Sequence, residues 1–424
     1  MSARRDFIKA AGAAGALAAL GHGASARAQS LGRVVVVGGG YGGATAARYL
    51  RLWSEGKIDV TLVEREAAFV SCPLSALVVG GSKRIEDITV GYDGLRKLGV
   101  KVIRGEAASV DADKKVVALR DGRSLPYDRL VLSPGIDFML GEMAGLDAPD
   151  AFERVPHAWH AGPQTVLLRK QLEDMKDGGV YAITIPLAPY RCSPAPYERV
   201  CQVAWYFRNR KPKSKIIVLD ANEEIQAEKP LFQAAWNGPY KGLIDYRPNS
   251  NVAEIDVAGR TAVTDLGDKQ VADVLNVIPP QRAGLIAQQA GAINVNSRWC
   301  QVNWLSLEST ARPGIHILGD AAFPGPAMPK SGHMANQHAK TAAAAIIELM
   351  NDRPPSATPV MSNTCYSFVD DRNVIHVTST HTYDAADKTM KAVPGSGGTS
   401  AAANELEGKY AFAWARNIWF DMLG

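Results

Sequence analysis

The sequence predicts an α/β protein, because a strand–turn–helix–strand pattern occurs twice along the chain and the composition changes near residue 354. The first pattern spans residues 31–64 and the second spans residues 180–220. Apolar β-branched runs such as Val34–Val37 are long enough for strands buried on both faces of a parallel sheet. We therefore expect two Rossmann-like domains, followed by a smaller C-terminal α+β domain.

The first pattern carries a dinucleotide-binding motif. Gly38, Gly40 and Gly43 follow the strand at G-x-G-x-x-G spacing. Ala44–Leu52 then reads as a helix, and Glu64 ends the second strand 21 residues after Gly43. The glycines allow a tight turn beside a pyrophosphate, the helix N-terminus offers free N–H groups, and the acid accepts a ribose hydroxyl. These residues predict a dinucleotide site and leave both NAD and FAD open.

The second pattern keeps the strands and the helix but lacks the glycines. Val180–Ile185 is followed by a turn with four prolines over residues 186–196, and Tyr197–Arg208 reads as the next helix. Proline removes N–H donors and stiffens the turn, so this turn does not suit a pyrophosphate. We therefore expect no NAD(P)H site in the second domain, which disfavours an NADH-dependent disulfide reductase.

A Gly-Asp pair favours FAD at the first motif. Ile315–Leu318 reads as a strand that ends at Gly319 and Asp320. The pair resembles the second FAD fingerprint of flavoproteins with two dinucleotide folds, in which the aspartate bonds the ribityl chain; a plain strand-ending turn is the alternative. We expect a discontinuous FAD-binding domain over residues 29–163 and 274–353. The second domain is expected at 164–273, and a domain close to the flavin or to an interface at 354–424.

The first 28 residues resemble a twin-arginine export signal. Arg4 and Arg5 precede a mildly apolar run that ends at Leu20, and Ala26–Ala28 has the A-x-A form of a cleavage site. The run is too short to span a membrane. We therefore expect a signal peptide over residues 1–28, no transmembrane span, and a periplasmic protein in a compartment that permits disulfides.

The charge gives no reason to expect a nucleic-acid partner. The whole chain carries a net charge of +4, and residues 1–28 supply four basic residues against one acidic residue, a net +3. The rest of the chain is therefore close to neutral. A hydrophobic content of 46% and a charged content of 21% are typical of a globular protein with a real core.

The cysteines are the candidate reactive groups: Cys72, Cys192, Cys201, Cys300 and Cys365. None has the spacing of a metal ligand or of a c-type haem attachment site, so we expect no metal site and no haem on this chain. Cys72 follows Glu64 by eight residues, where the chain of such folds runs along the isoalloxazine edge. A thiol there could bond the flavin or attack a substrate, and a packed structural cysteine is the alternative. Structural roles are favoured for Cys201 and Cys300. The four cysteines other than Cys72 allow three pairings.

Together these motifs resemble the flavoprotein subunit of flavocytochrome c sulfide dehydrogenase, a family similar in fold to glutathione reductase. The resemblance covers essentially the chain after the leader. Its most specific parts are Cys72, Cys192 in a PYRC segment and Cys365 in an NTCYS segment. The resemblance implies FAD bound covalently through Cys72 and a redox-active disulfide between Cys192 and Cys365. Glu198 matches an acidic residue that manages a proton in this family, and an exposed carboxylate at a helix start is the alternative.

The same resemblance implies the activity and the partner. Sulfide would be oxidised to sulfur or polysulfide through the disulfide and FAD, and the electrons would pass to a separate c-type cytochrome subunit that carries the haem in a heterodimer. One alternative is a sulfide:quinone oxidoreductase, in which the aromatic tail Tyr410–Phe420 would contact a membrane rather than a cytochrome. Another is a non-catalytic flavin partner of a sulfur-oxidising complex.

Overall fold

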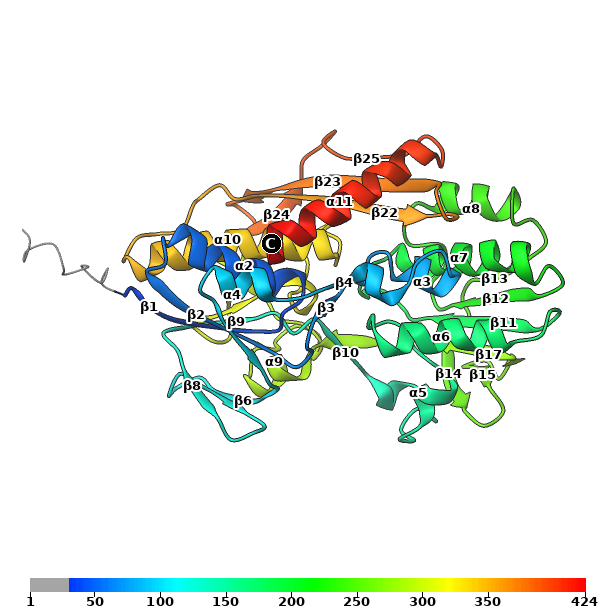
Figure 1. The fold of residues 1–424 in the computed structure, drawn as a ribbon, viewed down its shortest axis with the longest axis horizontal. Coiled ribbons are helices and arrows are strands. Elements are labelled where there is room, and N and C mark those ends of the chain that lie inside the picture. The colour runs from blue at the N-terminus through cyan, green and yellow to red at the C-terminus, as the bar shows by residue number, and fades with distance from the viewer. Residues whose placement is uncertain (1–29) are drawn as a thin grey trace, which may run out of the picture.

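The computed structural model describes residues 30–424. Two sheets built mainly of parallel strands lie next to each other along the long axis of the molecule. The C-terminal segment lies across both of them (Figure 1). The export signal expected at residues 1–28 lies outside the described residues. Two sheets of this kind, with helices packed on them, confirm the predicted α/β class.

The first sheet contains the dinucleotide motif. It has seven strands in the order β19-β20-β21-β9-β1-β2-β5, and the five strands from β21 to β5 are parallel to one another. Helices α2 and α10 pack against each other on one side of it (Figure 1). The bounds are β1 Gly32–Val37, α2 Tyr41–Trp53, β2 Ile58–Glu64, β5 Lys101–Arg104, β9 Arg129–Leu132, β19 Val302–Asn303, β20 Glu308–Ser309, β21 Ile315–Ile317 and α10 Gly332–Met350.

The second sheet is wholly parallel, in the order β13-β12-β11-β17. Strand β17 pairs with β11, so it belongs to this sheet although we expected residues from 274 onward to return to the first domain. A short buried strand carries no sequence signal for the sheet that it joins. The bounds are α6 Pro163–Asp174, β11 Val180–Ile185, α7 Ala195–Arg210, β12 Lys215–Asp220, α8 Lys229–Asn237, β13 Ile244–Arg247 and β17 Val274–Val277.

The C-terminal segment forms an antiparallel sheet and a long helix. Strand β22 packs against both α10 and α7, so it joins the two Rossmann-like units (Figure 1). Between residues 30 and 424, no helix is both long enough and apolar enough to cross a membrane. The bounds are β22 Val360–Phe368, β23 Val374–Asp384, β24 Thr389–Ala392, β25 Gly398–Thr399 and α11 Glu405–Leu423.

Shorter elements complete the fold. Two small antiparallel sheets, β6-β7-β8 and β14-β15-β16, flank the parallel sheets. The bounds are β3 Phe69–Val70, α3 Ser75–Gly80, β4 Thr89–Val90, α4 Asp93–Lys97, β6 Ala107–Asp111, β7 Val116–Leu119, β8 Ser124–Pro126, β10 Ile136–Phe138, α5 Ala151–Arg154, β14 Val252–Asp256, β15 Thr261–Thr264, β16 Lys269–Val271, β18 Gln281–Ala283 and α9 Leu285–Gln289.

Gly43 sets how closely α2 packs against the turn after β1. A Cβ atom at this position would lie 1.8 Å from the Gly38 carbonyl oxygen. We expect Gly43→Ala to lower the free energy of unfolding by about 1–3 kcal/mol, because the helix must move away from the turn. Urea unfolding measures the change. Gly141→Ala is the control, since nothing lies within 4 Å of its Cβ position, and a Gly43→Ala variant as stable as this control would contradict the prediction.

Candidate functional site

A cavity of about 580 Å³ lies where the first sheet, the second sheet and the C-terminal segment meet. Its volume is within the range of small-molecule and cofactor sites. All but one of the residues predicted to form the site line this cavity, and Gly43 is the exception because it packs behind the turn. The lining members are Gly38, Gly40, Glu64, Cys72, Cys192, Glu198, Gly319, Asp320 and Cys365.

The glycine turn forms a cradle at one end of the cavity. Gly38 has a φ of +96°, and a Cβ there would lie 2.3 Å from the Ser133 carbonyl oxygen, so only glycine fits. Gly40 faces open space, and no side chain caps the N-terminus of α2 that follows it. The free N–H groups at a helix N-terminus bind phosphate well. This end of the cavity therefore fits the pyrophosphate of FAD.

Two carboxylates mark the positions expected to bind the sugar and the ribityl chain. The Gly39 and Glu66 N–H groups donate to the two oxygens of Glu64 at 2.5 and 2.9 Å, which hold this carboxylate at the cavity wall. The Oδ1 atom of Asp320 is buried and has no partner among the described residues. Burial raises the pKa of Asp320, against the nearby charges of Arg191 and Lys330. An unpaired buried acceptor in a cavity fits a ligand that carries hydroxyl groups.

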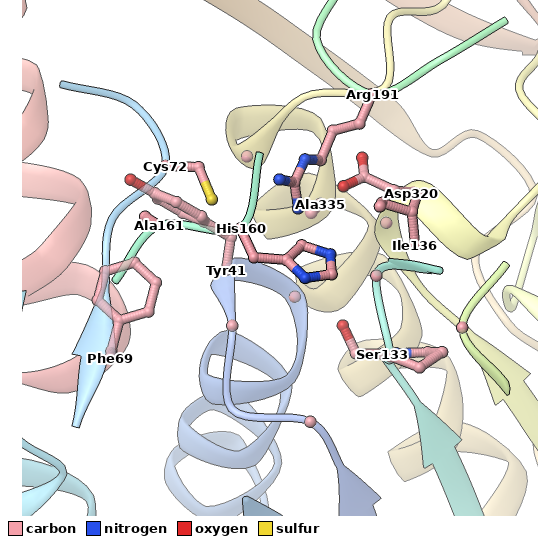
Figure 2. A pocket seen from close by; sticks show the side chains of 18 of the residues that line it. Tyr41, Phe69, Cys72, Ser133, Ile136, His160, Ala161, Arg191, Asp320 and Ala335 are labelled. Carbon is pink, nitrogen blue, oxygen red and sulfur yellow. The ribbon is translucent and has the colours of Figure 1, made fainter. Parts of the chain in front are cut away.

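Cys72 lies on the cavity wall, in the loop after Glu64. It is half-buried and lines the cavity (Figure 2). Its neighbours Pro73 and Ser75 also line the cavity. The hydroxyl groups of Ser71 and Tyr41 lie 2.7 Å apart and hold the start of this loop against α2. The alternative of a packed core cysteine is therefore wrong for Cys72.

Cys192 lies within the proline-rich turn and has the unusual φ of +58°. A non-glycine residue in this left-handed backbone conformation is strained by about 1 kcal/mol or more. Strained residues of this kind are often found at functional sites. The Cys192 N–H donates to the Lys330 carbonyl oxygen at 2.9 Å. The Lys330 ammonium in turn donates to the carbonyl oxygens of Asp320 and Ala322 at 2.8 and 2.6 Å. Lys330 therefore holds the turn that carries Cys192 next to the turn that carries Gly319 and Asp320.

Cys365 approaches the same cavity from β22. Its Sγ atom lies 3.3 Å from the Asn363 Nδ2 donor, and Asn363 is itself bonded to the Ser331 hydroxyl at 2.6 Å. Burial raises the pKa of Cys365 to about 11, against the Asn363 hydrogen bond. Burial, and then the Cys365 charge, raises the pKa of Cys192. All five cysteines are free thiols in this structure, and these two line one cavity from distant segments of the chain.

Glu198 lies in the first turn of α7, six residues after Cys192. Its side chain is buried, and its Oε1 atom accepts a hydrogen bond from the Phe368 N–H of β22 at 3.0 Å. Burial raises the pKa of Glu198 to about 7, against this hydrogen bond and the charge of Arg199. The alternative of an exposed carboxylate is therefore wrong. A carboxyl group that titrates near neutral pH is suited to accept and release protons.

Several residues that line the cavity were not predicted from the sequence. Arg191, Arg199 and Trp159 line the cavity, and Arg199 lies 5.2 Å from the centre of the Trp159 ring. Each arginine is next to a predicted site residue in the sequence, whereas Trp159 carries no such signal. Cys201 and Cys300 are buried away from the cavity, and Cys201 accepts a hydrogen bond from the Trp236 indole. Both are packed in the core, as a structural role requires.

Three family models match the chain. The model of pyridine nucleotide-disulphide oxidoreductases matches residues 32–159. The central model of the sulfide dehydrogenase [flavocytochrome c] flavoprotein chain matches residues 165–279, and the flavin-binding model of flavocytochrome c sulphide dehydrogenase matches residues 357–423. The matches follow one another along the chain and cover all three parts of the fold.

Individual relatives agree with the family models. The sulfide dehydrogenase [flavocytochrome c] flavoprotein chain of Chlorobaculum thiosulfatiphilum is 61% identical over 46 residues, 11% of this chain and 94% of that sequence. The mitochondrial sulfide:quinone oxidoreductase of Mus musculus is 24% identical over 315 residues, 70% of this chain and 67% of that protein. The sulfide:quinone oxidoreductase structure from Aquifex aeolicus has a TM-score of 0.74 at 19% identity, over 92% of this chain and 91% of that chain.

The fold, the cavity and these matches define a flavin-binding oxidoreductase of the pyridine nucleotide-disulphide oxidoreductase type. Within this class, the chain belongs to the family of flavoprotein chains of flavocytochrome c sulfide dehydrogenase. The family resemblance predicted from the sequence and the oxidoreductase class are thereby confirmed. The flavin-binding match and the dinucleotide cradle support FAD as the cofactor.

The buried Glu198 carboxyl predicts a pH-dependent stability. Its pKa is raised from 4.5 to about 7, so the folded state holds this proton more tightly than the unfolded chain. As the pH rises from about 4.5 to 7, the wild type should lose about 3 kcal/mol of stability relative to Glu198→Gln. Urea unfolding across this range measures the difference. The control Glu223→Gln, at an exposed carboxyl, should follow the wild type, and a pH-independent difference for Glu198→Gln would contradict the prediction.

Proposed function

We propose that this chain oxidises sulfide to sulfur or polysulfide through a Cys192–Cys365 redox disulfide and FAD, and passes the electrons to a c-type cytochrome subunit in the periplasm. The observation that carries the proposal is that these two thiols and the dinucleotide cradle share one cavity. Membership of the family supports the sulfide substrate and the cytochrome partner. The twin-arginine pattern supports export.

The residues of the chain account for the sulfur chemistry. Hydrosulfide attacks one sulfur of the disulfide and the S–S bond breaks, which gives a persulfide on one cysteine and a thiolate on the other. Closure of the disulfide again releases one sulfur atom at oxidation state zero, one proton and two electrons. FAD, when bound, supplies the acceptor for this electron pair. Glu198 accepts the proton of H₂S, because its pKa of about 7 leaves part of it ionised at neutral pH.

Cys72 would tether FAD, through a thioether to the 8α-methyl group. Its place on the cavity wall, beyond the ribose-binding Glu64, supports this role. A covalent link is useful in the periplasm, because no pool of FAD refills an empty site there. Residues Gly38, Gly40, Glu64, Gly319 and Asp320 would hold the rest of the cofactor.

A sulfide:quinone oxidoreductase is the second candidate. The similarity to such enzymes and the exposed aromatic side chains Tyr410 and Phe420 of α11 favour it. The two family models of flavocytochrome c favour the cytochrome. The deciding experiment supplies the purified holoprotein with sulfide and either a c-type cytochrome or a soluble quinone. Faster reduction of the quinone would overturn the cytochrome proposal, and no turnover with either acceptor would favour a non-catalytic flavin partner.

The disulfide role predicts the behaviour of two variants. Cys192→Ser and Cys365→Ser should each lower the rate of sulfide-dependent cytochrome c reduction by about 100-fold or more, because neither can form the S–S bond that sulfide attacks. Stopped-flow absorbance of the haem measures the rate. Cys300→Ala is the matched control, because this thiol is buried outside the cavity and its variant should keep the wild-type rate to within about threefold. Retention of full activity by Cys192→Ser or Cys365→Ser would rule out the disulfide.

The tether predicts where the flavin goes on denaturation. In acid, the yellow flavin of the wild type should precipitate with the protein, and intact mass should show the added FAD. Cys72→Ala should release all flavin into the supernatant. The Cys300→Ala variant should behave like the wild type. Free flavin from the wild type would contradict the covalent link.

A further inference from the structure

The end of strand β12 carries a buried aspartate, Asp220, that has no place in the chemistry above. Asp220 ends the second strand of its strand–helix–strand unit, as Glu64 ends β2 in the first unit (Figure 1). In a nucleotide-binding fold, an acid at this position binds a ribose hydroxyl. Glu64 lines the cavity, whereas Asp220 is fully buried and lies outside the cavity wall. The same position therefore has a different use in the second unit.

Asp220 accepts four hydrogen bonds from its own chain. Its Oδ2 atom accepts from the hydroxyl groups of Tyr197 and Tyr246 at 2.8 and 3.0 Å. Its Oδ1 atom accepts from the backbone N–H and the side-chain amide of Asn222 at 3.0 and 2.7 Å. A carboxylate has about four acceptor sites, so these donors leave none for a ribose. Asp220 therefore acts as an anchor within the protein.

Tyr197 connects this anchor to the end of the proline-rich turn. It is fully buried in the first turn of α7, which begins where the proline-rich turn ends. The bond from its hydroxyl to Asp220 therefore fixes the start of α7 against the end of β12. The N–H of Ala195, the first residue of α7, donates to the Cys192 carbonyl oxygen at 3.0 Å. Cys192 is thus bonded directly to the end of the turn that Asp220 holds.

Asn222 holds the start of the same turn. Its Nδ2 atom donates to the Pro186 carbonyl oxygen at 3.0 Å, and its Oδ1 atom accepts from the Ala188 N–H at 3.0 Å. The same Nδ2 atom donates to Asp220, so both hydrogens and the oxygen of the amide are used. Two neighbouring side chains at the end of β12 therefore hold both ends of the turn, and Cys192 lies between these ends.

The position of Cys192 depends on how firmly the turn is held. Its backbone is strained, with a φ of +58°, and such strain persists only when the surrounding structure imposes it. A disulfide with Cys365 requires Cα atoms that are about 4.4–6.8 Å apart. A turn released at either end would adopt more conformations in the dithiol protein. Closing the S–S bond would then cost more conformational entropy.

We propose that Asp220 and Asn222 are positioning residues for the sulfur chemistry, because they hold the proline-rich turn so that the Cys192 thiol stays within bonding reach of Cys365. This inference rests on the proposed function. The acid that binds a ribose in a nucleotide fold holds a redox cysteine in this unit. Neither residue touches the reacting sulfur, so the measurable effect is on the stability of the disulfide.

The first test measures that stability in the purified holoprotein. The protein is equilibrated at pH 7 without oxygen in mixtures of reduced and oxidised dithiothreitol, and peptide mass spectrometry counts the Cys192–Cys365 disulfide. Each disulfide forms from two thiols as one oxidised dithiothreitol is reduced, so electrons and protons balance. Asn222→Ala should shift the equilibrium toward the two thiols by about tenfold, because it removes the bonds at the start of the turn. For this two-electron couple, tenfold is about 30 mV.

Two tyrosine variants form a matched pair. Tyr197→Phe removes one hydroxyl from Asp220 and keeps the ring, so the equilibrium should shift toward the thiols by about threefold or more. Tyr246→Phe is the control. It removes a hydroxyl from the same Asp220 oxygen, but Tyr246 lies on β13 and holds no part of the turn. This control should stay within about twofold of the wild type.

The outcomes separate the inference from the proposed function. Wild-type equilibria in both Asn222→Ala and Tyr197→Phe would overturn the inference. An equal shift in Tyr197→Phe and Tyr246→Phe would also overturn it, because the loss would then reflect a general loosening around Asp220. A wild-type protein that forms no Cys192–Cys365 disulfide, even in excess oxidised dithiothreitol, would instead overturn the proposed function.

The second test needs no disulfide. In the reduced protein, hydrogen–deuterium exchange is followed by mass spectrometry with fragmentation to single residues. Tyr197→Phe should speed the exchange of the Cys192 N–H by about threefold or more, although its acceptor, the Lys330 carbonyl oxygen, is unchanged. The amides of β1 are the internal reference. A Cys192 N–H that exchanges at the wild-type rate in Tyr197→Phe would overturn the link between Asp220 and this cysteine.

Discussion

The site depends on how strand β22 is bonded to both Rossmann-like units. The Phe368 N–H donates to Glu198 of α7, and the Gln202 amide of the same helix donates to the Phe368 carbonyl oxygen at 3.0 Å. In the middle of the strand, the Thr364 N–H donates to the His333 ring of α10 at 3.0 Å. Cys365 lies between these bonds. A strand held on both sides of Cys365 leaves this thiol little freedom to move away from the cavity.

The second Rossmann-like unit keeps the strands and the helix of a nucleotide-binding fold but has different residues at the binding turn. The parallel strands and the helix remain, but prolines replace the glycines at the turn, and Cys192 and Glu198 occupy the place where a pyrophosphate would be bound. Sheet and helix depend on buried apolar residues, whereas binding depends on the few residues of the turn. The scaffold therefore tolerates a complete exchange of the turn.

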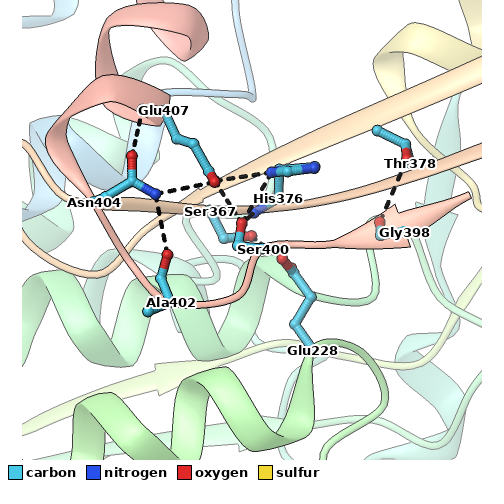
Figure 3. A network of polar contacts seen from close by, with 9 residues as sticks. All are labelled: Glu228, Ser367, His376, Thr378, Gly398, Ser400, Ala402, Asn404 and Glu407. Atoms are coloured by element: carbon cyan, nitrogen blue, oxygen red, sulfur yellow. Dashed lines mark hydrogen bonds and ion pairs between the residues drawn. The ribbon is translucent and has the colours of Figure 1, made fainter.

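Much of the architecture could be predicted because it follows from local pattern. The runs Val34–Val37 and Val180–Ile185 are strands, and Glu405–Leu423 is a helix. The cavity residues were predicted from motifs and from a family resemblance. The hydrogen bond from the Ser367 hydroxyl to the buried Glu228 carboxyl (Figure 3) could not be predicted in this way, because the two residues are 139 positions apart in the chain. The sheet that β17 joins was mispredicted for the same reason, because the pairing of two distant strands cannot be read from the sequence of either strand alone.

Lys330 links two functions that are usually considered separately. Its carbonyl oxygen holds the Cys192 turn, and its ammonium, which lies 3.8 Å from the centre of the Trp299 ring, holds the backbone of the Gly-Asp turn. The position of the Gly-Asp turn and the position of the Cys192 thiol therefore depend on the same residue. A change that displaces this lysine alters the flavin end and the sulfur end of the cavity at once, so neither can be redesigned alone.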